Sequence, residues 1–476
     1  MGEIGNDIFF SSIGELNARL TAREVSAVEL ARAFSDRLER LGPRYNALAL
    51  GLRPEALRKA KEVDQEIKRG RLRGPLQGIP YGVKDLLSYA GQPTTWGAKP
   101  YAGQVFDYNA TIIDKLADVG AVITGKLAMV ELAGGGGYRY ASASLTGPGL
   151  NPWDRTRWSG GSSSGSAAAV AAGLVTFAIG SETSGSIVTP ASYCGVTALR
   201  PTYGLVSRHG AMALSWTLDK LGPFARCAED CGLVLHAIAG QDGNDPGSAG
   251  KSFYYTPQYA RPLKELRLGF APADFKGSAA PVLDAALGVL KAAGIQLVEI
   301  PWPRFPYGPV LSTILAAEEA SIFEPLITSG QVDQLADQAQ IAGLKASLDV
   351  AAKDYLKAMR IRRLIQEAFR KVFGNVDALV APGRSGPATK IDEPLSPPPG
   401  AAPQAVSTSP SEGFAGIVPA GNLAGLPALV LPCGFTENLP VALQLMSAPF
   451  SENLLLSIGK DFQSRTDWHK RRPPQV

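Results

Sequence analysis

Lys84 is the first residue whose surroundings indicate chemistry. It stands in the segment IPYGVKDLL, among apolar residues where a strand should bury it. Burial disfavours the charged ammonium and lowers the pKa of a lysine towards the neutral amine, which can accept a proton as a general base. A surface pair with Asp85, or a side chain whose tip reaches solvent, would explain the same segment without catalysis.

Two turns rich in serine and glycine, at 159–166 and 183–186, are the other candidates. Small residues ahead of a helix expose backbone N–H groups that favour anions or oxyanions. The second turn follows a strand, so it could hold its N–H groups towards a developing oxyanion while Ser186 attacks the same carbon. An ordinary helix cap and a tight strand-to-helix connection remain alternatives. The first turn lacks the G-K-[ST] ending of a P-loop, and the second is no G-x-S-x-G elbow.

The elements that must position these segments alternate between strand and helix. Residues 12–70 have helical periodicity, with Ser26 and Glu29 spaced for a capping box. A short buried strand is expected within 78–87, a helix at 111–119, and a strand from Ala121. The helix AAAVAAGLV and the strand TFAIGSE separate the two serine turns, which could therefore lie side by side. This alternation predicts an α/β layered fold.

The second half of the chain continues the pattern. Strands are expected at 266–270 and 296–300 around a helix at 280–293, followed by a long helical stretch over 311–373. A strand begins at Ala378, a Pro-rich surface loop covers 383–413, and strand-like sequence resumes at 427–433. No internal repeat or break in composition divides the chain, so we expect a single domain over 1–476.

Composition narrows the classes of function. The 47 basic and 43 acidic residues leave a net charge of +4, which gives no electrostatic case for nucleic acid or an anionic membrane. The N-terminus lacks a secretory signal and no run of about 18 apolar residues occurs, so the cytoplasm is the expected location.

Cysteine and histidine are too sparse to define a metal or disulfide framework. The four cysteines form no C-x-x-C pair, which favours reduced, buried thiols. Three histidines (His209, His236 and His469) lie away from the serine turns, and no cluster has ligand spacing. No metal or other cofactor is expected.

Taken together, the three segments resemble the amidase signature family. The stretches that carry the resemblance are GIPYGVKD (78–85), GGSSSGSAAAVAAG (160–173), SETSGSI (181–187), CGVTALRPTYGLVSRHG (194–210), LDKLGP (218–223) and LPVALQLMSAPFSENLLL (439–456). The resemblance implies a central mixed, twisted β-sheet flanked by helices on both faces. It implies a signature core over about 75–240 and a helical substrate-channel region over about 306–373.

The resemblance also implies roles for individual residues. The family's base falls on Lys84, its bridging serine, usually held by a cis peptide, on Ser162, and its acyl-accepting nucleophile on Ser186. Ser163 matches a supporting serine near the lysine. The implied oxyanion hole consists of the backbone N–H groups of Thr183, Ser184, Gly185 and Ser186. Ala133, Gly134 and Gly135 match a loop that lines the acyl pocket in relatives.

The nucleophile turn departs from the usual family pattern T-D-x-G-G-S-I-R. Here it reads S-E-T-S-G-S-I-V, so Glu182, Ser184 and Val188 replace an aspartate, a glycine and an arginine. The usual carboxylate–arginine pair cannot form, and Glu182 must find another partner. The four glycines of 134–137 suggest either a roomier or more mobile acyl pocket, or a flexible loop alone.

The resemblance implies hydrolysis of C–N bonds in small amides, and also of aryl esters and carbamates (urethanes), through an acyl-enzyme on Ser186. A small-molecule substrate, no nucleic acid, no membrane, and a monomer or homodimer are then expected, as for stand-alone amidases. The alternative is the glutaminase-type A subunit of a tRNA-dependent amidotransferase. Its usual nucleophile turn differs from SETSGSIV, and this chain is not notably basic. A non-catalytic binding protein would not be expected to keep Lys84, Ser162 and Ser186 together.

Overall fold

A single sheet of eleven strands runs through the computed structural model, which describes residues 5–395 and 416–474. Its strand order is β1-β3-β2-β4-β6-β5-β10-β11-β9-β7-β8. The strands are β1 (Leu48–Gly51), β2 (Pro80–Lys84), β3 (Val122–Leu127), β4 (Phe177–Glu182), β5 (Thr197–Arg200), β6 (Lys220–Ala225), β7 (Arg267–Phe270), β8 (Gln296–Glu299), β9 (Ala378–Pro382), β10 (Ala428–Thr436) and β11 (Leu439–Ser447).

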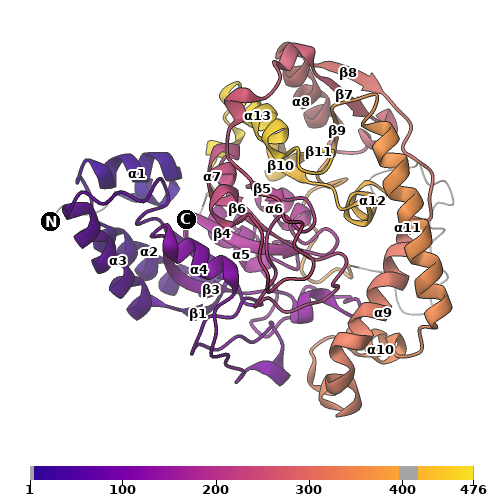
Figure 1. Ribbon diagram of the computed structural model, residues 1–476, viewed down its shortest axis with the longest axis horizontal. Coiled ribbons are helices and arrows are strands. Elements are labelled where there is room, and N and C mark those ends of the chain that lie inside the picture. Colours follow the sequence, from indigo (N-terminus) through magenta and orange to yellow (C-terminus); the bar gives the residue numbers. More distant parts are fainter. Residues whose placement is uncertain (1–4, 396–415, 475–476) are drawn as a thin grey trace.

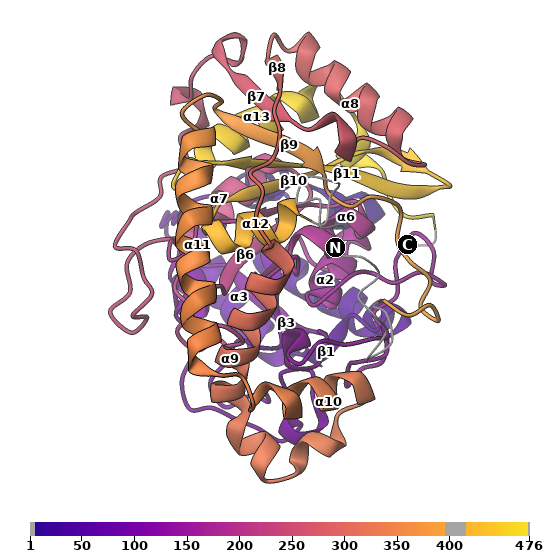
Figure 2. The ribbon, with the colours of Figure 1, turned by 90° about the vertical axis from the view of Figure 1, so that its right-hand side faces the viewer.

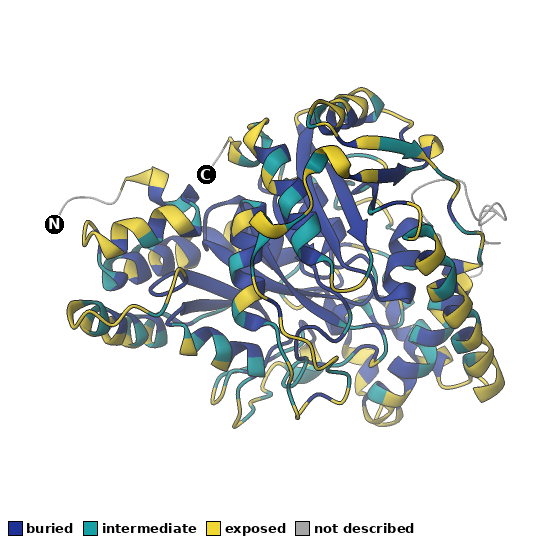
Figure 3. Cartoon of the chain, turned by 45° about the horizontal axis from the view of Figure 1, so that its top comes forward, coloured by how far each residue is buried: buried dark blue, intermediate teal, exposed yellow. Residues whose placement is uncertain are grey.

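The sheet is mixed. Strand β2 runs parallel to both β3 and β4, and β7 runs parallel to β8 and β9. The pairs β4–β6, β5–β6, β5–β10, β10–β11 and β9–β11 are antiparallel. Every residue of β2, β4 and β6 is buried, as expected for strands with both faces covered. The predicted α/β fold with a mixed sheet is therefore confirmed (Figure 3).

Helices cover both faces of this sheet. They are α1 (Ile13–Thr21), α2 (Ala27–Leu41), α3 (Arg53–Lys68), α4 (Thr111–Asp118), α5 (Ser164–Ala171), α6 (Val188–Cys194), α7 (Ala228–Ile238), α8 (Ala280–Ala292), α9 (Tyr307–Thr328), α10 (Gln338–Ser347), α11 (Ala352–Val372), α12 (Ile417–Ala424) and α13 (Glu452–Ser464). Helices α1–α3 lie at one end of the molecule, and α9–α11 lie at the other (Figure 1). We call α9, α10 and α11 the helical arm (Figure 2).

Elements with a strong local signal lie where the sequence predicts them. Strand β2, helix α4 and strand β3 confirm the expectations for 78–87, 111–119 and the strand from Ala121. The capping box is present: Ser26 Oγ accepts a hydrogen bond from the Glu29 backbone N–H (3.1 Å), and the Ser26 N–H donates to the Glu29 carboxylate (2.8 Å). No described helix combines the length and apolar character that crossing a membrane requires.

Three expectations need correction or stay open. The prediction that 12–70 is helical is wrong at 48–51, where β1 pairs with β3. A strand of four residues is too short to show a period of hydrophobicity, so its pairing with a distant strand could not be recognised from these residues. The stretch 311–373 is helical but divided into three helices. Helix α9 ends at Thr328, shortly before Gly330 with its positive φ of 76°, and a second break separates α10 from α11. Residues 396–413 of the predicted Pro-rich loop lie outside the described residues.

Gly222 permits the close approach of β6 to β5. A Cβ atom at this position would lie 2.1 Å from the Leu199 carbonyl oxygen. We expect Gly222→Ala to lower the free energy of unfolding by about 1–3 kcal/mol, because backbone would have to move. Gly288 in α8 is the matched control, since no atom lies within 4 Å of its would-be Cβ. Gly288→Ala should leave stability equal or raise it by about 0.4–1 kcal/mol. Urea unfolding of both variants measures this difference, and equal midpoints would contradict the packing argument.

Candidate active site

Lys84 ends β2 with its side chain fully buried. Its Nζ donates to Ser162 Oγ (2.7 Å), Ser181 Oγ (2.9 Å) and Ser163 Oγ (3.2 Å). The surface pair with Asp85 does not form, because the Asp85 carboxylate pairs instead with Lys126 (2.8 Å). The lysine is thus surrounded by hydroxyl groups, none of which carries charge.

The parallel strands β2 and β4 bring these groups together. Val83 is level with Ile179 in the pairing of the two strands, so the carboxyl ends of both strands meet at one edge of the sheet. The 183–186 turn leaves that same edge directly after β4. Polar groups gather where parallel strands end, because the loops that follow them converge there.

Ser163 ties the lysine to β4. Its Oγ donates to the Ser181 carbonyl oxygen (3.1 Å) and accepts from the Ser181 N–H (3.3 Å). This position supports the expected role of Ser163 beside the lysine. The peptide bond between Gly161 and Ser162 is cis, as the family resemblance implies. Ser181, in contrast, had no predicted role, although it contacts Lys84 directly.

Burial lowers the pKa of Lys84 to about 7, against the opposing charges of Asp219 and Glu182. A buried ammonium loses its hydration, and hydroxyl groups replace only part of that interaction. Near neutral pH the neutral amine is therefore a large fraction of the population.

Glu182 finds the partner that the turn itself lacks. Its carboxylate accepts from Arg200 Nη1 of β5 (2.7 Å) and from Asn422 Nδ2 of α12 (2.7 Å), and the Glu182 and Arg200 side chains are both fully buried. It also accepts the backbone N–H groups of Ile187 (2.8 Å) and Val188 (2.9 Å). Burial alone would raise the pKa of Glu182, but the charges of Arg200 and Lys220 and these hydrogen bonds lower it to about 2.

The 183–186 turn leaves its backbone N–H groups unused. Among the described residues, none of the four donates a hydrogen bond to a protein acceptor. Ser186 is largely buried, with 8% of its surface exposed. The structure brings together Lys84, Ser162 and Ser163. In the described part of the chain, no hydrogen bond joins Ser186 to Ser162. Catalytic hydrogen bonds are often long in ligand-free enzymes and tighten when substrate binds.

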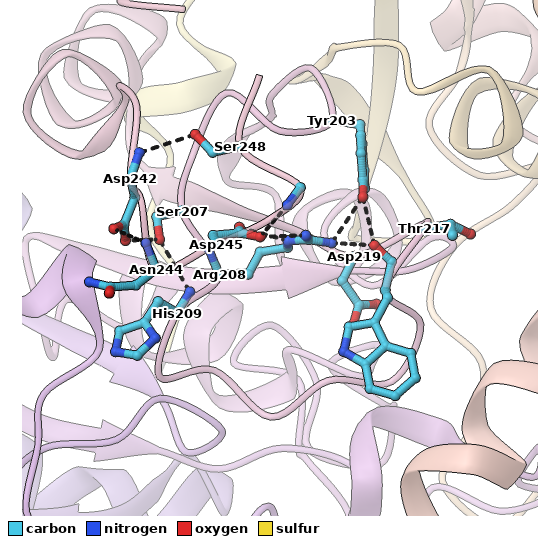
Figure 4. A network of polar contacts seen from close by, with 12 residues as sticks. Tyr203, Ser207, Arg208, His209, Thr217, Asp219, Asp242, Asn244, Asp245 and Ser248 are labelled. Atoms are coloured by element: carbon cyan, nitrogen blue, oxygen red, sulfur yellow. Dashed lines mark hydrogen bonds and ion pairs between the residues drawn. The ribbon is translucent and has the colours of Figure 1, made fainter. Parts of the chain in front are cut away.

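A cavity of about 230 Å³ lies beside this turn. Ala133 from the glycine-rich loop, Ser181, Thr183 and Asp219 contribute to its lining. Its wall also contains Arg208 and Asp245, whose side chains are joined by two hydrogen bonds of 2.9 and 2.6 Å (Figure 4). The cavity thus has polar walls beside the 183–186 turn, but of the described residues Lys84, Ser162 and Ser186 do not contribute to its lining.

The glycine-rich loop that includes Gly134 and Gly135 is held by the helical arm. The Gly136 N–H donates to the Glu319 carboxylate (2.9 Å), and a Cβ on Gly136 would lie 2.5 Å from the Gln340 carbonyl oxygen. Close packing against α9 and α10 therefore requires glycine at 136. The role of Ala133, Gly134 and Gly135 in an acyl pocket stays a prediction.

Two residues of the site escaped the sequence analysis, Ser181 and Asp219. Both lie inside stretches that carry the family resemblance, SETSGSI and LDKLGP, but only the strand pairing brings Ser181 to Lys84. Asp219 accepts a hydrogen bond from Thr183 Oγ1 (2.6 Å), a contact across 36 residues that no local pattern signals.

A mixed sheet that carries a buried lysine among serines, next to a serine-ending turn with free N–H groups, is typical of enzymes with a lysine base and a serine nucleophile. The chain belongs to the amidase signature family, since the family model described as Amidase matches residues 29–456. It is 36% identical to the A subunit of glutamyl-tRNA(Gln) amidotransferase from Carboxydothermus hydrogenoformans, over 98% of this chain and 99% of that one.

Solved structures agree with this membership. The peptide amidase of Stenotrophomonas maltophilia is 33% identical, with a TM-score of 0.84 and 98% of each chain covered. The A subunit of glutamyl-tRNA(Gln) amidotransferase from Thermotoga maritima is 27% identical, with a TM-score of 0.79 over 98% of this chain and 97% of that one.

These relatives contradict two expectations. The predicted hydrolysis of small amides, aryl esters and carbamates, as in stand-alone amidases, is wrong, because full-length relatives at 36–37% identity are the A subunits of amidotransferases. The prediction of a small-molecule substrate without nucleic acid is wrong for the same reason, since those relatives are named for a tRNA and as one subunit of an enzyme. The amidotransferase alternative was disfavoured because the sequence SETSGSIV departs from the turn usual in that subunit. The structure shows that Glu182 finds its charged partner outside this segment, in Arg200 of β5.

The buried pair of Glu182 and Arg200 makes a prediction about stability. Arg200→Met should lower the free energy of unfolding at pH 7 by about 3–5 kcal/mol, because it leaves a buried carboxylate without its cation. The pKa of Glu182 lies below its unfolded value of 4.5, so its contribution is complete above that pH and is lost as pH falls towards 2. The deficit of the variant should therefore shrink below pH 4.5.

Urea unfolding at several pH values measures this deficit. Arg363→Met is the matched control, because Arg363 pairs with Glu367 on the surface with its side chain 71% exposed. It should leave the unfolding midpoint unchanged. An Arg200→Met protein as stable as the control at pH 7 would refute the importance of the pair.

Proposed function

We propose that this protein is the glutaminase-type A subunit of a tRNA-dependent amidotransferase, releasing ammonia from glutamine through an acyl-enzyme on Ser186. The observation that carries the proposal is the buried Lys84 amine, bonded to Ser162 next to the 183–186 turn, in a chain that matches such subunits from end to end. A protein of this kind works in the cytoplasm, with other subunits and a tRNA as partners.

Lys84 supplies the base in this mechanism. Its neutral amine takes the proton of Ser162 Oγ, which in turn takes the proton of Ser186 Oγ. The Ser186 oxygen then attacks the carboxamide carbon of glutamine. The two serines come within hydrogen-bond distance as the substrate binds.

The backbone N–H groups of Thr183, Ser184, Gly185 and Ser186 stabilise the oxyanion that develops on the carboxamide oxygen. The proton held by Lys84 returns through Ser162 to the leaving nitrogen, and ammonia departs. Water then attacks the ester on Ser186, again activated through Ser162, and glutamate is released. No metal or other cofactor takes part in any step.

The surrounding loops define the substrate site in this proposal. Ala133, Gly134 and Gly135 line the side that receives the substrate chain, and the helical region of about 306–373 frames the channel. The support for this assignment is the cavity that Ala133 shares with Ser181 and Thr183, together with the contact between Gly136 and the helical arm.

Replacing the nucleophile tests the proposal directly. Ser186→Ala should reduce glutamine hydrolysis roughly 10³-fold or more while the fold persists, since the attacking oxygen is gone. Ammonia release from glutamine by the assembled enzyme measures this, and circular dichroism checks the fold. Ser192→Ala is a control in α6, because the Ser192 hydroxyl only donates to the Val188 carbonyl oxygen (2.7 Å). Normal rates in Ser186→Ala would sink the nucleophile assignment.

The lysine makes a prediction about pH. The base must be neutral, and burial lowers the pKa of Lys84 to about 7. We therefore expect kcat/KM for glutamine to fall below that pH as the amine becomes protonated, and to level off above it. Lys84→Met should remove most activity at every pH. A wild-type rate that is flat between pH 5.5 and 8.5 would contradict a lysine base.

A further inference from the structure

Asp219 connects the 183–186 turn to a second loop. Its Oδ1 accepts from Thr183 Oγ1 (2.6 Å), and its Oδ2 accepts from the backbone N–H groups of Leu214 (2.8 Å) and Ser215 (2.9 Å). The loop 214–219 leads directly into β6, the strand that pairs with β4. Asp219 forms no ion pair with any described residue, so its carboxylate serves these three donors.

Glu318 of α9 holds the other side of that loop. Its carboxylate accepts from the hydroxyl of Ser215, and from the N–H (3.2 Å) and hydroxyl (2.8 Å) of Thr217. The Tyr355 hydroxyl of α11 donates to the same carboxylate (3.0 Å), and Arg362 Nη2 of α11 donates to the Thr217 carbonyl oxygen (2.7 Å). Glu318 is 5% exposed, and its bond to the Ser215 hydroxyl is buried, while the bonds to Thr217 and Tyr355 are partly buried.

The turn is therefore fixed at both ends. Glu182 binds the N–H groups of Ile187 and Val188, which follow the turn, and Asp219 binds the hydroxyl of Thr183, which begins it. Donors of an oxyanion hole stabilise charge only if they are held in place before the reaction, because movement during the reaction costs free energy. In the described part of the chain, the Thr183 side chain has no hydrogen bond other than the one to Asp219.

We infer that Asp219 is a positioning residue for acylation, and that Glu318 couples the seating of the helical arm to the same turn. This inference rests on the proposed function, because it takes the 183–186 turn as the oxyanion hole. A change in the position of the helical arm then alters the rate of acylation through a series of hydrogen bonds. These run from Glu318 to the loop 214–219, from that loop to Asp219, and from Asp219 to Thr183. A partner or substrate that binds the helical arm and displaces it would change kcat without contacting Ser186.

A double-mutant cycle tests the first link. Asp219→Asn and Thr183→Val should each lower kcat for glutamine roughly 10- to 100-fold with KM nearly unchanged, since the turn loses its anchor. The double variant should be no slower than either single variant, because both remove the same bond. Thr183→Ser keeps the hydroxyl and should restore most of the rate. Independent losses that multiply in the double variant would overturn the inference.

A pH profile separates positioning beside Lys84 from a merely structural role. The charge of Asp219 opposes the lowering of the Lys84 pKa by burial. Burial raises the pKa of Asp219 itself, while its hydrogen bonds from Thr183, Ser215 and Leu214 favour the charged form. Asp219→Asn removes that charge, so the acidic limb of the rate profile should move to lower pH. Thr183→Val leaves the charge and should not move the limb. Glu318→Gln should lower kcat less than Asp219→Asn and also leave the limb in place.

Asp242 provides the matched control. It accepts the hydroxyl of Ser207 (2.5 Å; Figure 4). It also accepts the hydroxyl of Thr111 (2.6 Å), and in the described part of the chain it has no hydrogen bond to the 183–186 turn or to the loop 214–219. Asp242→Asn should keep kcat within about twofold. Should Asp219→Asn fail to fold, Thr183→Val and Thr183→Ser test the same bond without changing the carboxylate.

A fluorophosphonate probe distinguishes failure of this inference from failure of the proposed function. The probe modifies an activated serine and needs the same oxyanion donors but no glutamine. We expect Ser186 modification, followed by mass spectrometry, to slow in Asp219→Asn as kcat does. Wild-type labelling rates in that variant would refute the positioning role. Failure of the wild type to hydrolyse glutamine, while labelling still depends on Asp219, would refute only the proposed function.

Discussion

The desolvation of Lys84 is the constraint on which the rest of the site depends. The amine sits in full burial with three serine hydroxyls as its partners, and the neighbouring carboxylate of Asp85 is taken by Lys126. Hydroxyl groups can accept from an ammonium and donate to an amine, so they hold the lysine in place in either protonation state. A carboxylate at the same distance would have fixed the charged form and removed the base.

Glu182 is buried like Lys84, but its surroundings stabilise the charged form and not the neutral one. Glu182 is kept ionised by Arg200, and its oxygens bind the N–H groups that follow the nucleophile turn. The family's usual arginine at the position of Val188 would come from the start of α6, directly after the turn, whereas Arg200 comes from β5. The same electrostatic support is thus supplied from another strand. The sequence of the turn alone therefore gave too much weight to the replacement of that arginine by Val188, because Arg200 supplies the missing charge.

This contrast shows what the sequence can predict. Strand β2, helix α4 and the capping box at Ser26 carry their signal in adjacent residues, and all lie where expected. Strand β1 and the contacts of Ser181 and Asp219 depend on which strands pair and in which register, and this information is spread over distant segments. The cluster of Lys84, Ser162 and Ser163 was predicted only from the family resemblance, because members of a family share the strand pairing that brings these residues together.

Helix α9 links the two walls of the cavity through adjacent acidic residues. Glu318 holds the loop 214–219, and Glu319 accepts the N–H of Gly136 in the glycine-rich loop. Burial raises the pKa of Glu319 to about 7. A Cβ on Gly135 would lie 2.9 Å from Leu214 and 3.4 Å from Glu319, so the two loops and the helix are already in close contact. Because close-packed groups shift together rather than deform one at a time, any displacement of α9 must move both walls. Helix α9 therefore supports two walls of the cavity at once, the loop 214–219 through Glu318 and the glycine-rich loop through Glu319.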